Sequence, residues 1–302
     1  MDKKSQNQIY GVLGYPAKHS LSPAMHNAAF KALKINAEYR IFEVKPEELE
    51  DFLLKKIFDE GIAGFNITIP HKVRAREILE KAFPPDFNSP QILDSLHYVK
   101  ISGAINTVKR NGNKLDYWNT DASGFLKSLC EDLKFDPKGK NILIIGCGGA
   151  GRAIISSLTW VNVGVKKIYI NDIKEEAVHS AKDYFSQFPY MQDKLDFILS
   201  KDISAIVKSC DLLINATPVG MKEDVSVIDK SLMHEKLSIY DIVYRKDGET
   251  RLIKDAKAKK LRTESGLSLL LWQGVDAFGL WTGQKAPIEI MRKALEEGVK
   301  KI

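Results

Sequence analysis

Apolar runs of strand length alternate with helix-like runs over the first eighty residues. The runs "QIYGVLG" (8–14), "AEYRIFEV" (37–44) and "GIAGFNITIP" (61–70) have the pattern of strands. The segments that follow them, 22–34, 46–60 and 71–83, have the pattern of helices. This β-α-β-α-β-α order predicts an α/β layered domain.

A second alternating unit begins near residue 121. The run "NILIIGCGGAGRAIISSLTW" (141–160) leads from a strand through a glycine loop into a helix, and two helix-like segments end the chain. Between the two units, "NGN" (111–113) predicts a hairpin turn, and the proline-rich stretch 83–95 predicts a loop or an insertion. Further strands are expected in "KKIYIND", "KLDFILS", "DLLINAT" and "LSIYDIVY".

The composition is that of a globular protein. A length of 302 residues suggests about two domains, and the contents of 44% hydrophobic and 28% charged residues are ordinary. No apolar run approaches the roughly 20 residues of a membrane span. The start of the chain lacks the apolar region of a signal peptide. We therefore expect a cytoplasmic protein that contacts no membrane.

The charge, the cysteines and the histidines exclude several kinds of site. The formal net charge is +6, and the basic residues are spread along the chain. This charge suits solubility or an anionic ligand, and the sequence contains no nucleic-acid-binding module. Cys130, Cys147 and Cys210 lie far apart and show no CxxC spacing. The six histidines form no HExxH or comparable pattern. We expect neither a structural disulfide nor a metal site.

The glycine loop has the spacing of a dinucleotide-binding turn. Gly146, Gly148 and Gly151 form G-x-G-x-x-G directly after an apolar run and at the start of a helix. Gly146 allows the tight turn, Gly148 lets the backbone approach a pyrophosphate, and Gly151 permits close packing of helix on strand. A glycine-rich turn of an ordinary α/β fold is the alternative. We favour a dinucleotide site at this loop.

An acidic residue follows the loop at the expected distance. Asp172 ends the strand-like run "IYIND", about 20 residues beyond the glycines, where an acid would bind the adenosine ribose hydroxyls. A 2′-phosphate there would meet a like charge, so Asp172 favours NAD. Lys174 and Arg152 keep NADP open as the alternative, and a plain turn aspartate is the other interpretation.

Two serines precede the first predicted helix, in "HSLSP" (19–23). Ser22 can cap that helix, with Pro23 at its first position. A cap does not account for Ser20. Two hydroxyls at a helix N-terminus could also hold an anion, because the free N–H groups there favour negative charge. We leave both interpretations open for Ser22.

A nicotinamide enzyme that acts on an alcohol needs a group that moves the hydroxyl proton. The chain offers no Tyr-x-x-x-Lys pair but contains "NITIPHK" (66–72) and "NTD" (119–121). Lys72 follows a strand end and a proline, so we expect it on a turn, where α/β folds often carry functional residues. Its position makes it a candidate for proton transfer, although a surface lysine is the ordinary alternative.

Seven motifs in order resemble the shikimate dehydrogenase family. They are "HSLSP", "NITIPHK", "GAINTV", "NTD", "GCGGAGRA", "NAT" and "LLWQG", and they span nearly the whole chain. The motifs "HSLSP", "PVGMK", "LLWQG" and "LWTG" look most like the quinate/shikimate dehydrogenase branch.

The resemblance implies an α/β fold with two domains. Residues 1–120, completed by C-terminal helices 267–302, would form an N-terminal α/β substrate-binding domain, and residues 121–266 a Rossmann-type NAD(P)-binding domain. The active site would lie in the cleft between them. The implied reaction is the reversible NAD(P)-dependent oxidation of shikimate or quinate to the 3-keto acid. The implied partner is this small molecule, and the chain would act as a monomer or homodimer.

The resemblance also implies individual roles. Lys72 would be the catalytic lysine, Asp121 its aspartate partner, and Ser20 and Ser22 would hold the substrate carboxylate. Further substrate contacts would be Thr68, Asn106, Tyr244 and Gln273. The cofactor residues would be Gly146, Gly148, Gly149, Ala150, Gly151, Asn171, Asp172, Thr217 and Gly266. Purely structural roles are the alternatives for three of the substrate contacts: Asn106 as a turn cap, Gln273 as a helix-surface residue and Tyr244 as a core residue.

The chain departs from the family pattern at three places. The stretch around 83–95 is longer than in most members, Ala122 replaces a frequent glycine, and Asp172 stands where NADP-dependent members carry an arginine. The last difference supports NAD. Two rival functions remain: a dehydrogenase of an amino- or otherwise modified shikimate, and a regulator that senses quinate or shikimate without turnover. A sensor would be free to lose Lys72 or Asp121, and both are present.

Overall fold

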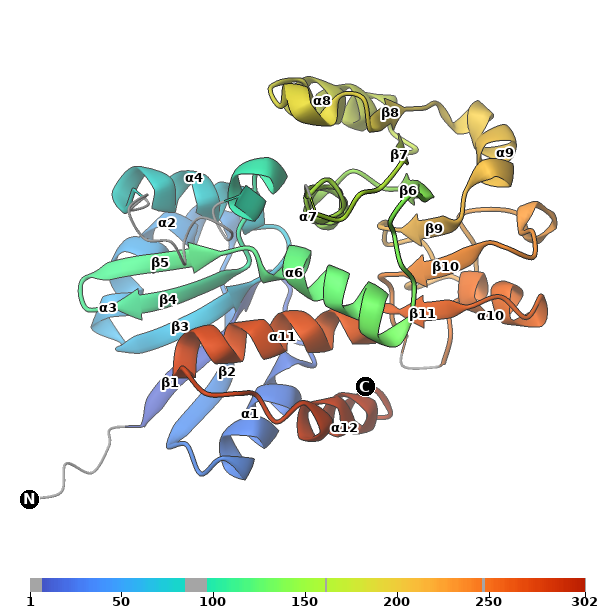
Figure 1. Cartoon of the computed structure of the whole chain (residues 1–302). Helices are drawn as coiled ribbons and strands as arrows, with labels where there is room; N and C mark the ends of the chain where they lie inside the picture. Colours follow the sequence, from blue (N-terminus) through green and yellow to red (C-terminus); the bar gives the residue numbers. More distant parts are fainter. Residues whose placement is uncertain (1–6, 85–96, 161, 246–247, 302) are drawn as a thin grey trace, which may run out of the picture. The chain divides into compact units, whose positions relative to one another are not determined.

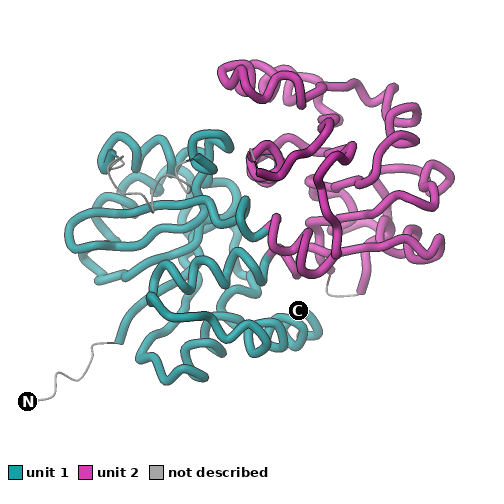
Figure 2. The backbone as a smooth tube through the Cα atoms, in the orientation of Figure 1, with its two compact units in different colours: residues 1–124, 270–302 teal, residues 125–269 magenta. Residues whose placement is uncertain are grey.

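The computed structural model describes residues 7–84, 97–160, 162–245 and 248–301 (Figure 1). The chain forms two compact units, shown in different colours in Figure 2. Unit 1 comprises residues 1–124 and 270–302, and unit 2 comprises residues 125–269. The chain passes from one unit to the other within helices α6 and α11, which span Thr120–Lys127 and Gly266–Thr282.

Unit 1 is built on a five-stranded mixed sheet. The strand order is β2-β1-β3-β4-β5, in which β2, β1 and β3 are parallel and β4 and β5 form an antiparallel hairpin. The hairpin turns at Gly112, at the predicted "NGN". All three predicted N-terminal strands are therefore confirmed. The strands span Gln8–Gly14 (β1), Ala37–Glu43 (β2), Ile62–Ile67 (β3), Thr107–Asn111 (β4) and Lys114–Trp118 (β5).

Helices cover both faces of this sheet, as Figure 1 shows. One face packs against the helical segment 46–60 and α4, through a core that includes Leu53, Phe65 and Leu79. The other face packs against α1 and α11, where Trp281 donates to the backbone oxygen of Val108 at 2.9 Å. The helices of unit 1 span Ser22–Ala32 (α1), Leu49–Asp51 (α2), Ile57–Asp59 (α3), Lys72–Ala82 (α4) and Ile288–Val299 (α12), and residues 97–102 are also helical.

Two local predictions in unit 1 need correction. The segment 46–60 is not a single α-helix, because residues 46–48 form a 3-10 turn and residues 52–56 a π-helical turn between α2 and α3. Ser22 is not the cap of α1 but its first residue, and the capping position belongs to Leu21. The predicted loop at 83–95 lies almost wholly outside the described residues.

Unit 2 carries a six-stranded parallel sheet. Its order is β8-β7-β6-β9-β10-β11, which is the Rossmann order 3-2-1-4-5-6 with its switch point between β6 and β9. This confirms the predicted Rossmann-type unit. The strands span Asn141–Ile145 (β6), Lys167–Asn171 (β7), Leu195–Phe197 (β8), Leu212–Asn215 (β9), Ser238–Asp241 (β10) and Thr263–Ser265 (β11).

Apolar residues on the strands of unit 2 are almost completely buried. Ile142, Leu143, Ile144 and Ile168 are each 0% exposed, as expected for parallel strands that are covered on both faces. The helices are Gly149–Leu158 (α7), Glu175–Ser186 (α8), Ile203–Ile206 (α9) and Arg251–Ala258 (α10). In the part of the chain that the structure describes, no helix is long and apolar enough to cross a membrane.

Candidate active site

Lys72 stands at the start of α4, within the helix predicted over 71–83 and not on the turn that its place after a proline suggested. The preceding residue, His71, is buried, and its Nε2 lies 2.7 Å from the backbone oxygen of Val44. This contact holds the first turn of α4 beside the end of β2. The side chain of Lys72 is 18% exposed, and its Nζ donates to Oδ2 of Asp121 at 2.6 Å. The structure therefore joins the lysine and the aspartate that the sequence predicted as a pair.

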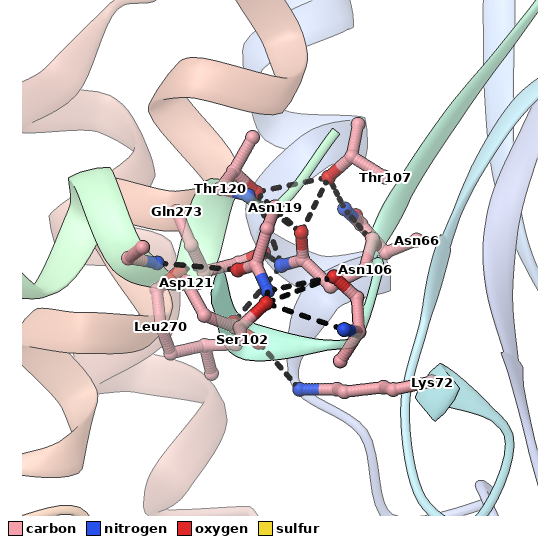
Figure 3. Close-up of polar contacts among 12 residues, drawn as sticks. Asn66, Lys72, Ser102, Asn106, Thr107, Asn119, Thr120, Asp121, Leu270 and Gln273 are labelled. Atoms are coloured by element: carbon pink, nitrogen blue, oxygen red, sulfur yellow. Dashed lines mark hydrogen bonds and ion pairs between the residues drawn. The ribbon is translucent and has the colours of Figure 1, made fainter. Parts of the chain in front are cut away.

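Asp121 is held from its other side by an asparagine. Its Oδ1 accepts a hydrogen bond from Nδ2 of Asn106 at 2.9 Å, so each carboxylate oxygen has a protein donor (Figure 3). The side chain of Asp121 is 13% exposed. A carboxylate fixed in this way holds the Lys72 ammonium in one place while leaving part of the pair open to a ligand.

The orientation of Asn106 is fixed by its neighbours. Its Oδ1 accepts from the backbone N–H of Thr120 at 2.6 Å and from the hydroxyl of Thr107 at 3.2 Å. Because the oxygen faces these donors, the Nδ2 group must face Asp121 and Gln273, whose Oε1 lies at 3.5 Å. Asn106 is 1% exposed. Its side chain caps no turn next to it in the sequence but accepts the backbone N–H of Thr120, the first residue of α6.

Gln273 lies inside unit 1, so the helix-surface interpretation is wrong for this residue. It is 5% exposed, and its Nε2 donates to the backbone oxygen of Leu270 at 2.8 Å (Figure 3). Its partner Asn106 is 167 residues away in the sequence. No local pattern could have placed the two together.

The two predicted serines are linked to this network through Tyr39. The hydroxyl of Ser20 accepts from the backbone N–H of Ser22 at 3.3 Å, so Ser20 rather than Ser22 supports the start of α1. The hydroxyl of Ser22 hydrogen-bonds to that of Tyr39. Tyr39 in turn donates to Oδ1 of Asn66 at 2.7 Å. Burial raises the pKa of the Tyr39 hydroxyl, and its bond to Ser22 opposes that shift.

Tyr39 and Asn66 complete a polar row along one face of the sheet. Nδ2 of Asn66 donates to the hydroxyl of Thr107 at 3.0 Å, and this hydroxyl lies 2.9 Å from that of Thr120. Tyr39 was not among the predicted site residues. Period-2 alternation places Tyr39 on the buried face of its strand but cannot tell a buried polar contact from core packing.

Thr68, a predicted substrate contact, directly follows β3. Its backbone N–H donates to the oxygen of Leu13 at 2.8 Å, which ties it to the end of β1. Its side chain is half-buried. Thr68 is thereby held at the same edge of the sheet as the start of α4 and its Lys72.

The glycine loop of unit 2 has the geometry that its sequence predicts. Gly146 has φ +108°, a conformation that favours glycine, and a Cβ there would lie 2.7 Å from the backbone of Ala216. A Cβ on Gly151 would lie 2.1 Å from the Gly146 oxygen, so the helix packs closely on the turn. Added Cβ atoms on Gly148 and Gly149 would meet nothing within 4 Å. Open space therefore adjoins the N-terminus of α7 and Ala150, where a pyrophosphate would bind.

The carboxylate of Asp172 is oriented by two backbone N–H groups. Its Oδ2 accepts from the backbone N–H of Cys147 at 3.1 Å, and its Oδ1 accepts from that of Lys174 at 3.1 Å. The carboxylate thus stands beside the glycine loop, with lone pairs left for ribose hydroxyls. These residues fit a dinucleotide. The same carboxylate contributes to raising the pKa of the Cys147 thiol to about 12, after burial as the main cause.

The remaining predicted residues of unit 2 lie near the carboxyl ends of its strands. The backbone oxygen of Asn171 accepts from Gly146 N–H at 2.7 Å, and its buried side chain donates to Ile198. Thr217 follows β9, and Gly266 opens α11, where a Cβ would lie 1.8 Å from the Ile242 oxygen. Tyr244 follows β10 and is half-buried, and burial raises the pKa of its hydroxyl. Within the described ranges, no group of three or more His, Cys, Asp or Glu side chains could hold a metal ion.

Comparison with known proteins gives consistent matches along the chain. Residues 12–85 match the family model for the shikimate dehydrogenase substrate binding domain, and residues 266–296 that for the shikimate 5′-dehydrogenase C-terminal domain. A shikimate dehydrogenase (NADP(+)) of Methanopyrus kandleri is 36% identical over 296 residues, covering 97% of this chain and 96% of the relative.

Two solved structures share the fold over nearly the full length. The shikimate 5-dehydrogenase of Listeria monocytogenes, in complex with shikimate and NAD, is 28% identical with a TM-score of 0.81, covering 98% of this chain and 99% of that one. The quinate dehydrogenase of Corynebacterium glutamicum, in complex with NAD, is 26% identical with a TM-score of 0.80, covering 96% and 99%.

Proposed function

Because the chain belongs to the shikimate dehydrogenase family of oxidoreductases, we propose that it oxidises shikimate, quinate or both reversibly to the 3-keto acid with a nicotinamide dinucleotide. The observation that carries this proposal is the ion pair of Lys72 and Asp121, 2.6 Å long, partly open to solvent and braced by Asn106. A protein that only senses the ligand would have no need of a lysine fixed in this way.

Lys72 would move the hydroxyl proton. In the oxidation its Nζ, as the free amine, accepts the proton of the ring hydroxyl, and in the reduction Nζ returns the proton to the developing alkoxide. Asp121 keeps Nζ in position through both directions. A bound nicotinamide ring supplies the other half of the chemistry, the acceptor or donor of a hydride. The residues described below bind and orient the substrate.

Neutral polar groups beside this pair suit a ligand with several hydroxyls. Asn66, Asn106 and Gln273 present amide groups that can both donate and accept, and Thr68 adds a hydroxyl. The hydroxyls of Ser20 and Ser22 stand at the N-terminus of α1, where backbone N–H groups favour a carboxylate. These features support binding of a polyhydroxy ring acid within unit 1.

NAD is the dinucleotide that Asp172 favours. A carboxylate held toward the ribose by two backbone N–H groups accepts hydrogen bonds from a 2′-hydroxyl and repels a 2′-phosphate. The curated relative from Methanopyrus kandleri is named for NADP(+), so this chain would differ from it in cofactor. The variant Asp172→Arg should shift the ratio of kcat/KM values toward NADP.

The first test measures nicotinamide absorbance during oxidation of shikimate and of quinate, each with NAD and with NADP. Turnover of either substrate, faster with NAD, would support both the reaction and the role of Asp172. Absence of turnover with all four pairs would overturn the proposed reaction. Equal or faster rates with NADP would overturn the cofactor assignment alone.

The second test separates the roles of two lysines in unit 1. Lys72→Met should lower kcat by about 10²- to 10⁴-fold with a smaller change in KM, because proton transfer matters mostly in the transition state. Lys55→Met is the matched control, since Lys55 is an exposed lysine paired with Asp51 at 3.1 Å. Normal kcat in the Lys72 variant would rule out the mechanism.

A further inference from the structure

A buried carboxylate stands where two neighbouring strands of unit 2 end. Asp241 is the last residue of β10, and it is 0% exposed. Its register partner is Asn215, the last residue of β9. Both lie at the carboxyl edge of the sheet. Asn215 is on β9, which borders the switch point, and Asp241 is on β10, the next strand. The reaction described above gives Asp241 no role.

Three neutral donors surround Asp241. Nδ2 of Asn215 donates to its Oδ1 at 2.8 Å, the backbone N–H of Val243 to the same oxygen at 3.1 Å, and the hydroxyl of Thr250 to Oδ2 at 2.6 Å. Burial raises the pKa of the Asp241 carboxyl, and these bonds oppose that shift. The two N–H groups can only donate to Oδ1, and the Thr250 hydroxyl donates to Oδ2 when the carboxylate is ionised.

Asn215 extends this anchor to the loop after β9. Its Oδ1 accepts from the backbone N–H of Thr217 at 3.0 Å and from the Thr217 hydroxyl at 2.6 Å. Its Nδ2 also donates to the oxygen of Val219 at 3.1 Å, and Val219 N–H donates back to the Thr217 hydroxyl. This loop lies against the glycine loop, since a Cβ on Gly146 would come within 2.9 Å of Thr217 Cγ2.

On its other side, Asp241 fixes the segment after β10. Val243, which donates to Asp241, is followed directly by Tyr244, the predicted substrate contact of unit 2. Thr250, the third donor, is the N-cap of α10 and accepts from Ile253 N–H at 3.3 Å. One carboxylate therefore joins the Thr217 loop, the Tyr244 segment and the start of α10.

We propose that Asp241 is a positioning residue that sets the dinucleotide-side loop at Thr217 and the substrate-side segment at Tyr244 together. The inference rests on the proposed function for the ligands of the two segments. It adds that the two contributions of unit 2 are coupled, because they share one buried acceptor. Alanine at this position would remove both acceptor oxygens and leave the buried donors of Asn215, Val243 and Thr250 without this partner.

Hydrogen exchange tests this coupling without any turnover. In Asp241→Ala, the amides of Thr217, Val219 and Val243 should all exchange at least about tenfold faster, since all three depend on the cluster. The matched control is Asp255→Ala on α10, an aspartate 8% exposed that pairs with Arg251 at 3.0 Å. Faster exchange on one side of Asp241 only, or equal effects in the control, would overturn the inference.

Ligand binding gives the readout that a general loss of stability would not produce. The Asp241 variant should weaken NAD binding in a calorimetric titration and raise KM for shikimate, each by about tenfold. The change in kcat should be smaller, because Lys72 and Asp121 belong to unit 1. Its loss of NAD affinity should be less than additive with Thr217→Val, and its rise in KM less than additive with Tyr244→Phe. Full additivity in both pairs would overturn the coupling.

The inference can still be tested if the Asp241 variant does not fold or if the proposed function fails. If Asp241→Ala fails to fold, Thr250→Val removes one donor, keeps the carboxylate and should produce the same paired changes at reduced size. If the wild-type chain oxidises neither shikimate nor quinate, the proposed function fails, while hydrogen exchange and the NAD titration still decide whether Asp241 holds both segments.

Discussion

Replacing Gly124 by alanine should damage unit 1 where two of its helices touch. Gly124 lies on α6, and a Cβ there would stand 2.5 Å from the backbone nitrogen of Gln273 and 2.9 Å from its Cα on α11. The contacted atoms are backbone, so a side-chain rotation cannot relieve the overlap. One helix must move away from the other: movement of α11 changes the distance between Asn106 and Gln273, and movement of α6 changes that between Asn106 and Thr120.

Gly279→Ala is the matched control for this substitution. Gly279 lies on α11, and among the described residues the nearest atom outside its own helix to an added Cβ would be the Gln284 oxygen at 3.9 Å. Both variants gain up to about 1 kcal/mol of helix propensity. Only the Gly124 variant adds an overpacking cost of about 1–3 kcal/mol. The difference between the two free energies of unfolding therefore isolates the steric cost, with Gly124→Ala the less stable by about 1–3 kcal/mol.

Urea unfolding followed by tryptophan fluorescence suits this measurement. Three of the four tryptophans, Trp118, Trp272 and Trp281, belong to unit 1, so the signal reports mainly on the unit that carries both substitutions. The kcat/KM for shikimate should also fall in Gly124→Ala and stay unchanged in Gly279→Ala. A Gly124 variant as stable and as active as the control would refute the reasoning.

Three further predictions concern unit 1. Burial lowers the pKa of His26 to about 3, so between pH 6.5 and pH 5 only the unfolded chain binds a proton at this residue. The free energy of unfolding should therefore fall by about 2 kcal/mol over that range, and His26→Phe should remove this part of the pH dependence in urea titrations. Tyr39→Phe removes the hydroxyl between Ser22 and Asn66 and should destabilise the chain by about 1–3 kcal/mol, which thermal unfolding would register or contradict. Asp121→Asn removes the partner that positions the lysine, so steady-state kinetics should show a fall in kcat of about 10²-fold or more, and an unchanged kcat would exclude that role.

Much of the backbone could be predicted because its signals are local. Strand runs, the turn at Gly112 and the glycine loop depend on residues only a few positions apart, and the structure has all of them. Asp172 was identifiable for the same reason, since the strand after the loop ends at a set distance. The resemblance to a family added the individual roles of Lys72, Asp121 and the substrate contacts, which no local pattern could assign.

The local signals failed where the sequence around a residue fits two local structures equally well. Ser22 before Pro23 has the pattern of a helix cap, yet the structure places Ser22 inside α1 and gives the supporting hydrogen bond to Ser20. Lys72 after a proline has the pattern of a turn, yet it begins α4. In both cases the residue is the first of its helix, and the exact end of a helix is the part that a sequence pattern locates least well.

The composition of the polar network was decided by the tertiary structure alone. The pairs Lys72–Asp121 and Asn106–Gln273 are 49 and 167 residues apart in the sequence, and they meet because the strand order brings β3 beside β4 while α11 returns to the same sheet. Tyr39 and Asp241 are buried strand residues, and the local sequence does not identify their partners Asn66 and Asn215. A hydrogen bond needs its partner's position to within a fraction of an ångström, and only packing between distant elements fixes that position.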